Sequence, residues 1–271
     1  MNYKIENESI HKSVKINGNT LHYFVNGNEE GKTIVFLHPA FGDHTCFDKQ
    51  VHYFSPSYHI ISIDLLGHGL TGVGKSKDKI TETAKHIAEI LKLENRENAH
   101  IVGVSLGSLL AQDFALKYPE KVLSLTGVGG YNINRKQKEI ATAQRKELAK
   151  WLFKAIFSMN AFRRYVASIT VIDQNEQARF YESASFFTRT SFTVMSGLNS
   201  IIQERIDIQR KYPLLILVGD KDAELALKSA NQWHTEEVNS EFHIIEQAGH
   251  CANMDNAVQF NQILMNFLTT K

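Results

Sequence analysis

The sequence predicts an α/β fold in which helices cover both faces of a mostly parallel sheet. Short apolar runs alternate along the chain with longer segments in which apolar residues recur at helical spacing. The runs at 33–37 and 214–218 contain almost no polar residues, which is typical of strands buried on both faces. The chain has 271 residues, 43% of them hydrophobic, enough to bury the core of one large domain.

The expected elements begin with a hairpin. Two strand-like runs at 13–16 and 20–25 flank Asn17-Gly18-Asn19, a turn sequence that tolerates positive φ. Further strands are expected at 33–37, 59–63, 101–104, 121–128, 214–218 and 241–245. Helices are expected between and after them, at 80–93, 106–118, 224–235 and 257–268.

One long segment interrupts this alternation. Between Gly129 and Tyr212 the sequence has no clear strand, but helical patterns occur at 136–157 and 176–187. We therefore predict a core domain made of residues 1–130 and 206–271, with a helical cap inserted at 131–205. Most aromatic residues of the cap are interpreted as its own core. The others, with Trp151 and Phe187 as first candidates, are expected to form an apolar wall over a binding site.

The charge balance argues against several classes of partner. The chain has 30 Lys and Arg residues and 29 Asp and Glu residues, so its net charge is +1. It has no basic run with interleaved aromatic residues, and we therefore expect no nucleic-acid or membrane surface. No targeting segment or run of roughly 20 apolar residues is present. Cys46 and Cys251 cannot form a disulfide framework. We expect a cytoplasmic protein that acts on a small molecule, and the sequence does not predict its oligomeric state.

The segment 99–119 carries the strongest chemical signal. It combines a buried strand, the turn Gly103-Val104-Ser105-Leu106-Gly107 and a helix. A G-x-S-x-G turn between strand and helix is typical of a nucleophile elbow, in which a strained turn exposes the serine hydroxyl. The two glycines suit this turn, because side chains there would collide with the strand or the helix. Ser105 is therefore the candidate nucleophile.

A serine hydroxyl needs a base to take its proton, and the base needs a carboxylate partner. Two loops that follow predicted strands supply these groups. Gly219-Asp220-Lys221-Asp222 offers two acids, and Gly249-His250 offers the base. The chain order is thus serine, acid, histidine, with Asp222 and Asp220 as alternatives for the acid.

Four motifs together resemble the α/β-hydrolase fold family, and the resemblance extends over nearly the whole chain. They are the turn His38-Pro39-Ala40, the loop Asp64 to Thr71, the elbow at Ser105, and the G-x-x-D and G-H ends at Asp222 and His250. The resemblance implies Ser105 as nucleophile, His250 as general base and Asp222, at the fourth position of G-x-x-D, as its carboxylate partner. Asp220 is the second choice.

The resemblance also implies an oxyanion hole made by the backbone N–H groups of Leu106 and Ala40. Pro39 stands where the family usually has glycine, which removes one N–H and stiffens the turn. If the turn is registered one residue later, Phe41 would donate instead. The spacing to Phe47, where the family often has an aromatic residue, favours Ala40.

No metal or cofactor is expected. His38 and His68 match no zinc motif and are interpreted as braces of their loops, and Asp64 as a structural residue. No G-x-G-x-x-G follows the first strand of a βαβ unit, so no dinucleotide is predicted. Cys251 is expected to line the site without acting as a second nucleophile.

The predicted function is hydrolysis of a carboxylic ester, with small to medium apolar groups preferred, through an acyl-enzyme on Ser105. The same three residues also fit a thioesterase, a carbon–carbon bond hydrolase or a perhydrolase of the haloperoxidase type. A non-catalytic small-molecule receptor is the alternative of a different class, since fold does not fix function. Cofactor-independent oxygenation, in which the histidine and the acid suffice, is a further alternative.

Overall fold

The computed structural model describes residues 9–206 and 209–270, and it is built around an eight-stranded sheet. The strand order is β1-β2-β4-β3-β5-β6-β7-β8. β1 and β2 pair antiparallel with their neighbours, whereas the strands from β4 to β8 pair in parallel. The strands are β1 Ile10–Ile16, β2 Asn19–Gly27, β3 Thr33–Leu37, β4 His59–Ile63, β5 Ala99–Val104, β6 Val122–Val128, β7 Leu214–Gly219 and β8 Ser240–Ile245.

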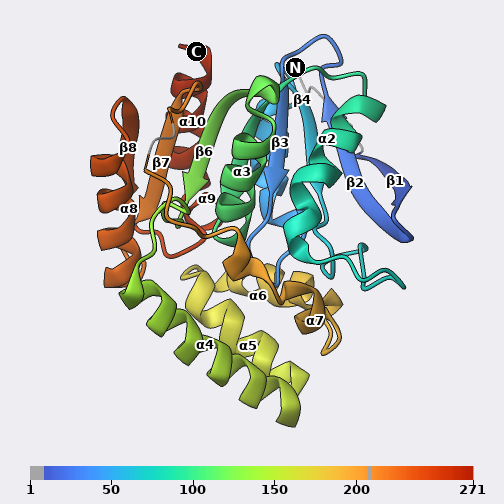
Figure 1. The fold of residues 1–271 in the computed structure, drawn as a ribbon, viewed down its shortest axis with the longest axis vertical. Helices are drawn as coiled ribbons and strands as arrows, with labels where there is room; N and C mark the ends of the chain where they lie inside the picture. Colours follow the sequence, from blue (N-terminus) through green and yellow to red (C-terminus); the bar gives the residue numbers. More distant parts are fainter. Residues whose placement is uncertain (1–8, 207–208, 271) are drawn as a thin grey trace.

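Helices cover both faces of the sheet, and α2 and α3 lie in front of it in Figure 1. The helices outside the β6–β7 connection are α1 Asp48–Phe54, α2 Thr83–Leu93, α3 Leu106–Lys117, α8 Glu224–Glu236, α9 Ala252–Asp255 and α10 Ala257–Thr269. Strand β3 shows why two layers are needed, because successive side chains of a strand point to opposite faces. Val35 and Leu37 join the core beneath α2, α3 and α8, while Ile34 and Phe36 join the core beneath α1 and α10.

This architecture confirms the predicted α/β class. The hairpin and the six further strands occur where the sequence patterns indicate them, and β3 and β4 have the predicted bounds. Helix α1 was not predicted from the pattern, because its seven residues are too few for a helical period to stand out. Within the two described ranges, no helix has both the length and the apolar character required to cross a lipid bilayer.

Four helices occupy the connection between β6 and β7. They are α4 Lys138–Phe157, α5 Met159–Thr170, α6 Gln174–Ser183 and α7 Ser191–Met195, and they lie together at one end of the sheet (Figure 1). We refer to residues 131–205 as the cap segment. The division into a core domain and a cap domain stays a prediction. Residues 1–8, 207–208 and 271, which it assigns to the core domain, lie outside the described residues.

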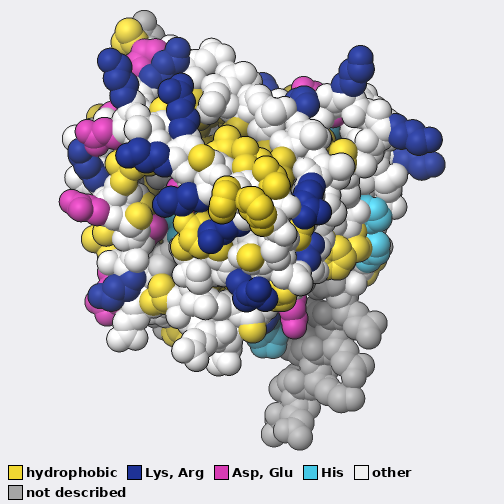
Figure 2. All heavy atoms as spheres, turned by 90° about the horizontal axis from the view of Figure 1, so that it is seen from below, with side chains coloured by type: hydrophobic (Ala, Val, Ile, Leu, Met, Phe, Trp, Pro, Cys, Tyr) yellow, Lys and Arg dark blue, Asp and Glu magenta, His cyan; other side chains and the backbone are white. Residues whose placement is uncertain are grey.

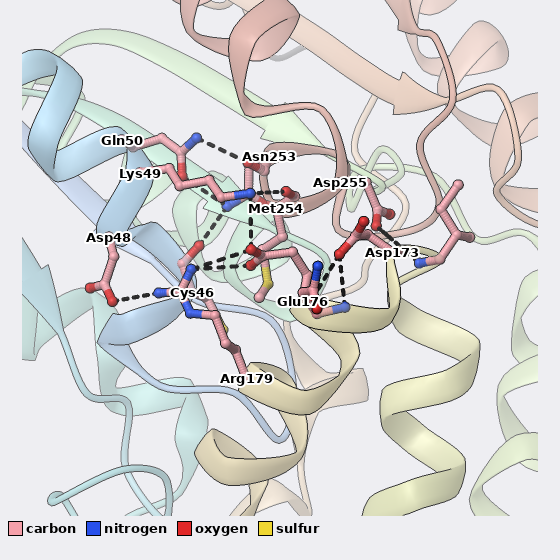
Figure 3. A network of polar contacts seen from close by, with 12 residues as sticks. Cys46, Asp48, Lys49, Gln50, Asp173, Glu176, Arg179, Asn253, Met254 and Asp255 are labelled. Carbon is pink, nitrogen blue, oxygen red and sulfur yellow. Dashed lines mark hydrogen bonds and ion pairs between the residues drawn. The ribbon is translucent and has the colours of Figure 1, made fainter.

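A polar network fastens the cap segment to the core (Figure 3). Glu176, a buried residue of α6, forms ion pairs with Lys49 of α1 at 2.9 Å and with Arg179 at 3.2 Å. Arg179 in turn pairs with Asp48 of α1 at 2.6 Å. Lys49 also donates to the carbonyl of Met254 in α9. The carboxylate of Glu176 therefore joins the cap segment to α1, and Lys49 extends this link to α9.

Candidate active site

The structure brings Ser105, His250 and Asp222 into one hydrogen-bonded line. Ser105 Oγ lies 2.7 Å from His250 Nε2, and His250 Nδ1 lies 2.8 Å from Asp222 Oδ2. Ser105 follows β5, Asp222 follows β7 and His250 follows β8. These three strands run parallel, so their carboxyl ends meet at one edge of the sheet, where sites of α/β folds are found.

The serine lies in a strained turn. Its φ is 52° and its ψ is −113°, a conformation that non-glycine residues rarely adopt, and its N–H donates to the carbonyl of Val128 at 2.7 Å. A Cβ at Gly103 would lie 2.2 Å from the Gly107 carbonyl oxygen, and a Cβ at Gly107 would lie 2.0 Å from that of Leu37. Both glycines of the motif are thus required, because β3, β5 and α3 meet without room for a side chain.

The two acids of the β7 loop have different surroundings. Asp222 accepts from His250 through Oδ2 and from the Ala223 N–H through Oδ1 at 2.7 Å. Asp220 instead accepts from the N–H of Ala248 at 3.0 Å. Asp220 therefore supports the loop that carries His250, and Asp222 contacts the imidazole itself.

The charge of Asp222 changes the proton affinity of His250. Burial disfavours the imidazolium, but the carboxylate and its hydrogen bond outweigh that penalty, so the pKa of His250 lies above its ordinary value of 6.5. The carboxylate can only accept, so Nδ1 donates to it and the neutral ring leaves Nε2 as the acceptor for the serine hydroxyl. This arrangement can remove a proton from Ser105.

The turn after β3 lies against the elbow. The buried His38 ring is fixed from both sides, because Nε2 accepts from the Leu65 N–H at 3.0 Å and Nδ1 contacts the Pro39 carbonyl at 2.8 Å. The carbonyl groups of residues 37 and 38 would contact any side chain at Gly107. Ala40 therefore follows a turn that packs on the start of α3. Leu106, the first residue of α3, has an N–H that no intrahelical acceptor reaches.

Phe41 connects this turn to the cap segment. Its backbone has a φ of 71°, and its buried ring meets three cap rings edge to face. The centroid of the Phe41 ring lies 5.0 Å from that of Trp151, 5.1 Å from that of Phe162 and 4.9 Å from that of Phe187. Trp151 and Phe187 are expected to be part of an apolar wall. Both contact the ring of Phe41, the residue that follows Ala40 in the chain.

The predicted bracing residues are tied into their loops. Asp64 accepts from the backbone N–H and the ring Nδ1 of His44 through Oδ1, and from the Leu70 N–H through Oδ2. His68 is buried and contacts the Leu66 carbonyl through Nδ1, and burial lowers its pKa to about 3. In the part of the chain that the structure describes, no three His, Cys, Asp or Glu side chains are grouped so that they could hold a metal ion.

Two residues near His250 were not identified from the sequence. Gly129 has a φ of 58°, and a Cβ there would lie 3.1 Å from ring atoms of His250. Only a residue without a side chain lets the imidazole approach β6 this closely. The signal that could have found it is the pair Gly129-Gly130 directly after a strand.

The second residue near His250 that was not identified from the sequence is Asp255. Its carboxylate links the loop that carries His250, called the base loop here, to the cap segment. Oδ2 accepts from the N–H of Gly249 at 2.8 Å, and Oδ1 accepts from the N–H groups of Ile172 and Asp173 at 3.0 and 2.9 Å. Burial raises the pKa of Asp255, although these backbone donors oppose the shift. No sequence motif marks this residue, because its partners are distant in the chain.

Cys251, next to the candidate base, is buried, and its N–H donates to the Thr170 carbonyl of α5 at 3.0 Å. Burial raises the pKa of its thiol well above the ordinary value. A thiol that stays protonated is a poor nucleophile. Cys251 therefore contributes a second backbone link between the base loop and the cap segment.

Comparison with known proteins agrees with this fold. Residues 32–152 match the family model of the alpha/beta hydrolase fold. The chain is 23% identical to the (E)-2-((N-methylformamido)methylene)succinate hydrolase of Acinetobacter baylyi, over 96% of this chain and 99% of that protein. It is 25% identical to a 2-hydroxy-6-oxononadienedioate/2-hydroxy-6-oxononatrienedioate hydrolase of Paraburkholderia phymatum, over 93% and 92% of the two chains.

Solved structures are similar over the same length. A carboxylesterase structure from Nitrososphaera gargenis superposes with a TM-score of 0.81 at 18% identity, over 96% of this chain and 98% of that one. The 2-hydroxy-6-oxo-6-phenylhexa-2,4-dienoate hydrolase of a Rhodococcus strain gives a TM-score of 0.76 at 17% identity, over 97% and 99%. Together with the sheet order and the four motifs, these matches identify the chain as a protein of the α/β-hydrolase fold.

Proposed function

We propose that the protein is a serine hydrolase that cleaves a carboxylic ester through an acyl-enzyme on Ser105. One observation carries this proposal, the continuous line from Ser105 Oγ through His250 to Asp222 with hydrogen bonds of 2.7 and 2.8 Å. A serine becomes a nucleophile near neutral pH when a base lies within hydrogen-bond reach and a third group orients that base. His250 and Asp222 are placed to supply the base and the orienting group, which supports the proposal.

In the proposed reaction, His250 Nε2 takes the proton of Ser105 Oγ as the oxygen attacks the ester carbonyl. The N–H groups of Leu106 and Ala40 stabilise the resulting oxyanion. The imidazolium then gives its proton to the leaving alkoxide, which departs as the alcohol. His250 next activates a water that releases the acid and restores Ser105. Asp222 stabilises the imidazolium in both halves of the reaction.

The aromatic contacts of Phe41 support an apolar substrate. Phe41 and Phe187 are buried, and both lie beside the turn that holds Ala40. Burial of apolar surface is worth roughly 25 cal/mol per Å², so a butyl-sized group would gain a few kcal/mol of binding under such a cover. We infer that small to medium apolar acyl or alkyl groups are preferred over charged ones.

Turnover of p-nitrophenyl butyrate by wild-type and variant protein tests the proposal. Ser105→Ala and His250→Ala should each lower kcat by several orders of magnitude, and the double variant should be little worse than either, since the residues act as a unit. A Ser105→Ala variant that hydrolyses the ester as fast as the wild type would overturn the acyl-enzyme on Ser105. No turnover of any ester by the wild type would favour a receptor.

Carbon–carbon bond hydrolysis is the second candidate. The names of the Paraburkholderia phymatum relative and of the Rhodococcus structure describe hydrolases of 2-hydroxy-6-oxo-dienoates. The experiment that tests this candidate measures kcat/KM for a coloured 2-hydroxy-6-oxo-dienoate and for esters and thioesters of graded chain length. A kcat/KM for the dienoate that exceeds that of every ester would assign the protein to this second class.

A further inference from the structure

Helix α4 of the cap segment exposes far more apolar surface than a helix of a closed core. Of its 20 residues only Ile140 and Ala155 are buried. Phe153, Ile156 and Phe157 are 65%, 67% and 73% exposed. With the exposed Leu148 and Leu152, these three residues form what we call the cap patch. Figure 2, which views the molecule from the side of the cap segment, shows hydrophobic side chains gathered on one face with Lys and Arg around them.

The side chains around the cap patch are strongly basic. Helices α4 and α5 carry seven Lys or Arg residues and two Glu residues, although the whole chain has a net charge of only +1. Both acids are already paired, Glu139 with Lys228 at 2.9 Å and Glu147 with Lys150 at 2.6 Å. The side chains of Arg145, Lys146 and Arg164, in contrast, form no hydrogen bond or ion pair with any described residue. We call these three residues the basic rim.

A shallow groove of about 540 Å³ runs beside the patch. It is lined by Ala149, Lys150, Phe153, Lys154 and Tyr165, so both apolar and cationic groups face it. Lys154 Nζ lies 4.6 Å from the centre of the Tyr165 ring. Its ammonium group therefore lies directly above apolar surface, which suits a ligand with an anionic head beside a hydrocarbon body.

The positive charge of the basic rim distinguishes between three binding partners that could cover the cap patch. A second copy of the chain would bring the same positive charges together, which opposes self-association. Nucleic acid would match the charge but not Leu148, Leu152 and Ile156, which cannot stack on bases. A surface of anionic lipids satisfies both features, because its phosphates attract the rim while its acyl region accepts the apolar side chains.

We propose that the cap patch and the basic rim dock the protein on an anionic lipid bilayer, with α4 lying in the interface. This revises the expectation of no membrane partner, which rested on the net charge of the whole chain and on finding no basic run with interleaved aromatic residues. The cap patch and two of the three rim residues lie on α4, and the third rim residue, Arg164, lies on the neighbouring α5. Trp151, on the other side of α4, contacts Phe41, so docking would place the lipid close to the cover of the candidate active site.

Sedimentation of the protein with lipid vesicles tests this proposal without any assay of activity. Vesicles of phosphatidylcholine with 30% phosphatidylglycerol are compared with vesicles of phosphatidylcholine alone, and the wild type should bind the anionic vesicles at least ten times more tightly. Arg145→Gln/Lys146→Gln should weaken binding about 25-fold, since each basic residue near an anionic surface contributes roughly fivefold. Phe153→Ser/Phe157→Ser should weaken it at least tenfold, through lost apolar contact.

Matched controls use exposed residues elsewhere on the protein. Val238 and Val258 are as exposed as the patch residues, and Lys92 and Lys211 are exposed lysines outside the cap segment. Val238→Ser/Val258→Ser and Lys92→Gln/Lys211→Gln should bind anionic vesicles like the wild type. Circular dichroism and the midpoint of thermal unfolding establish that every variant is folded.

Three results would overturn the proposal. The first is equal binding of the wild type to neutral and anionic vesicles. The second is binding that the folded patch and rim variants retain. The third is a dimer in analytical ultracentrifugation that the Phe153→Ser/Phe157→Ser variant dissociates, which would assign the face to a second copy of the chain.

Discussion

The loops that carry Ser105, Asp222 and His250 and the cap segment are held in place by different interactions. The loops are fixed by backbone hydrogen bonds and by close approaches at Gly103 and Gly107 that leave no space for a side chain. The cap segment rests on aromatic contacts and on charged side chains such as Glu176, and its longest helix buries only two residues.

This difference separates two tasks. The proposed proton transfer from Ser105 to His250 would need atoms held within a fraction of an ångström, which a rigid sheet edge provides. Substrate selection needs a cover of suitable shape and polarity, which side-chain contacts can vary without disturbing the sheet. Substitutions in the loops should therefore act mainly on kcat, and substitutions in the cap segment mainly on KM.

The largest expected effect separates the two acids of the β7 loop. Asp222→Asn should lower kcat roughly 10⁴-fold, because the amide no longer holds the required tautomer of His250. Asp220→Asn, its matched control, should cost about tenfold or less, since Asp220 contacts the backbone of Ala248 and the side chain of Lys221 but not the His250 ring. Steady-state kinetics with p-nitrophenyl butyrate measure both. The reverse ranking would move the catalytic acid to Asp220.

Asp222→Asn should also shift the pH dependence of kcat/KM in a predictable direction. Only neutral His250 accepts the serine proton, so kcat/KM of the wild type should fall as the pH drops through the raised pKa of His250. Asp222→Asn removes the charge that raises this pKa and leaves the opposing effect of burial. Its acidic limb should therefore move to lower pH, and an unmoved limb would show that another group controls it.

The next effect concerns the rigidity of the elbow. Gly107→Ala should reduce the free energy of unfolding by about 3 kcal/mol or more, because the new methyl group would overlap the Leu37 carbonyl. Gly72→Ala is the control, since nothing lies within 4 Å of a Cβ there, and its change should stay within about 0.5 kcal/mol. Urea denaturation measures both variants, and equal stabilities would contradict the tight packing at the elbow.

Asp255 lies between the two regions and should affect both. Asp255→Asn replaces one acceptor oxygen by an N–H₂ group that faces a backbone donor, which should cost about 1–3 kcal/mol of stability and lower kcat about tenfold. Asp173→Asn is the control, because Asp173 caps α6 without reaching the base loop. It should leave kcat unchanged. A kcat that both variants lower equally would show that Asp255 acts only through the cap segment.

The smallest effect is expected in the cap. Phe187→Leu should raise KM for apolar esters about fivefold and leave kcat for p-nitrophenyl acetate nearly unchanged, since only apolar contact is lost. Phe180→Leu is the control, because Phe180 is equally buried but has no ring contact with Phe41. If neither substitution alters the ranking of esters, the cap aromatic residues form only their own core.

Local patterns were sufficient to predict the sheet and the elbow. Strands β3 and β4 are uniformly buried runs between polar loops, and the glycines of the elbow are two residues from Ser105 on either side. Such features depend only on residues that are neighbours in the chain, so they can be predicted from a single sequence. The α/β class and the resemblance to α/β hydrolases rest on them.

Features that depend on distant residues could not be predicted. Gly129 matters because β6 passes beside His250, and Asp255 matters because its carboxylate reaches Gly249 and the end of α5. The choice between Asp220 and Asp222 rested on the family pattern, because both acids follow the same strand. The basic rim takes Arg164 from α5 and its other two residues from α4, so it is complete only where these two helices pack side by side.

Trapping the covalent intermediate tests the central claim most directly. Wild-type protein is mixed with p-nitrophenyl butyrate, quenched in acid within milliseconds to seconds, digested and analysed by mass spectrometry. A butyryl group on the peptide that contains Ser105, formed with a burst of p-nitrophenol and absent from Ser105→Ala, is the predicted result. Steady turnover with no adduct on Ser105, or with the adduct on another residue, would contradict it.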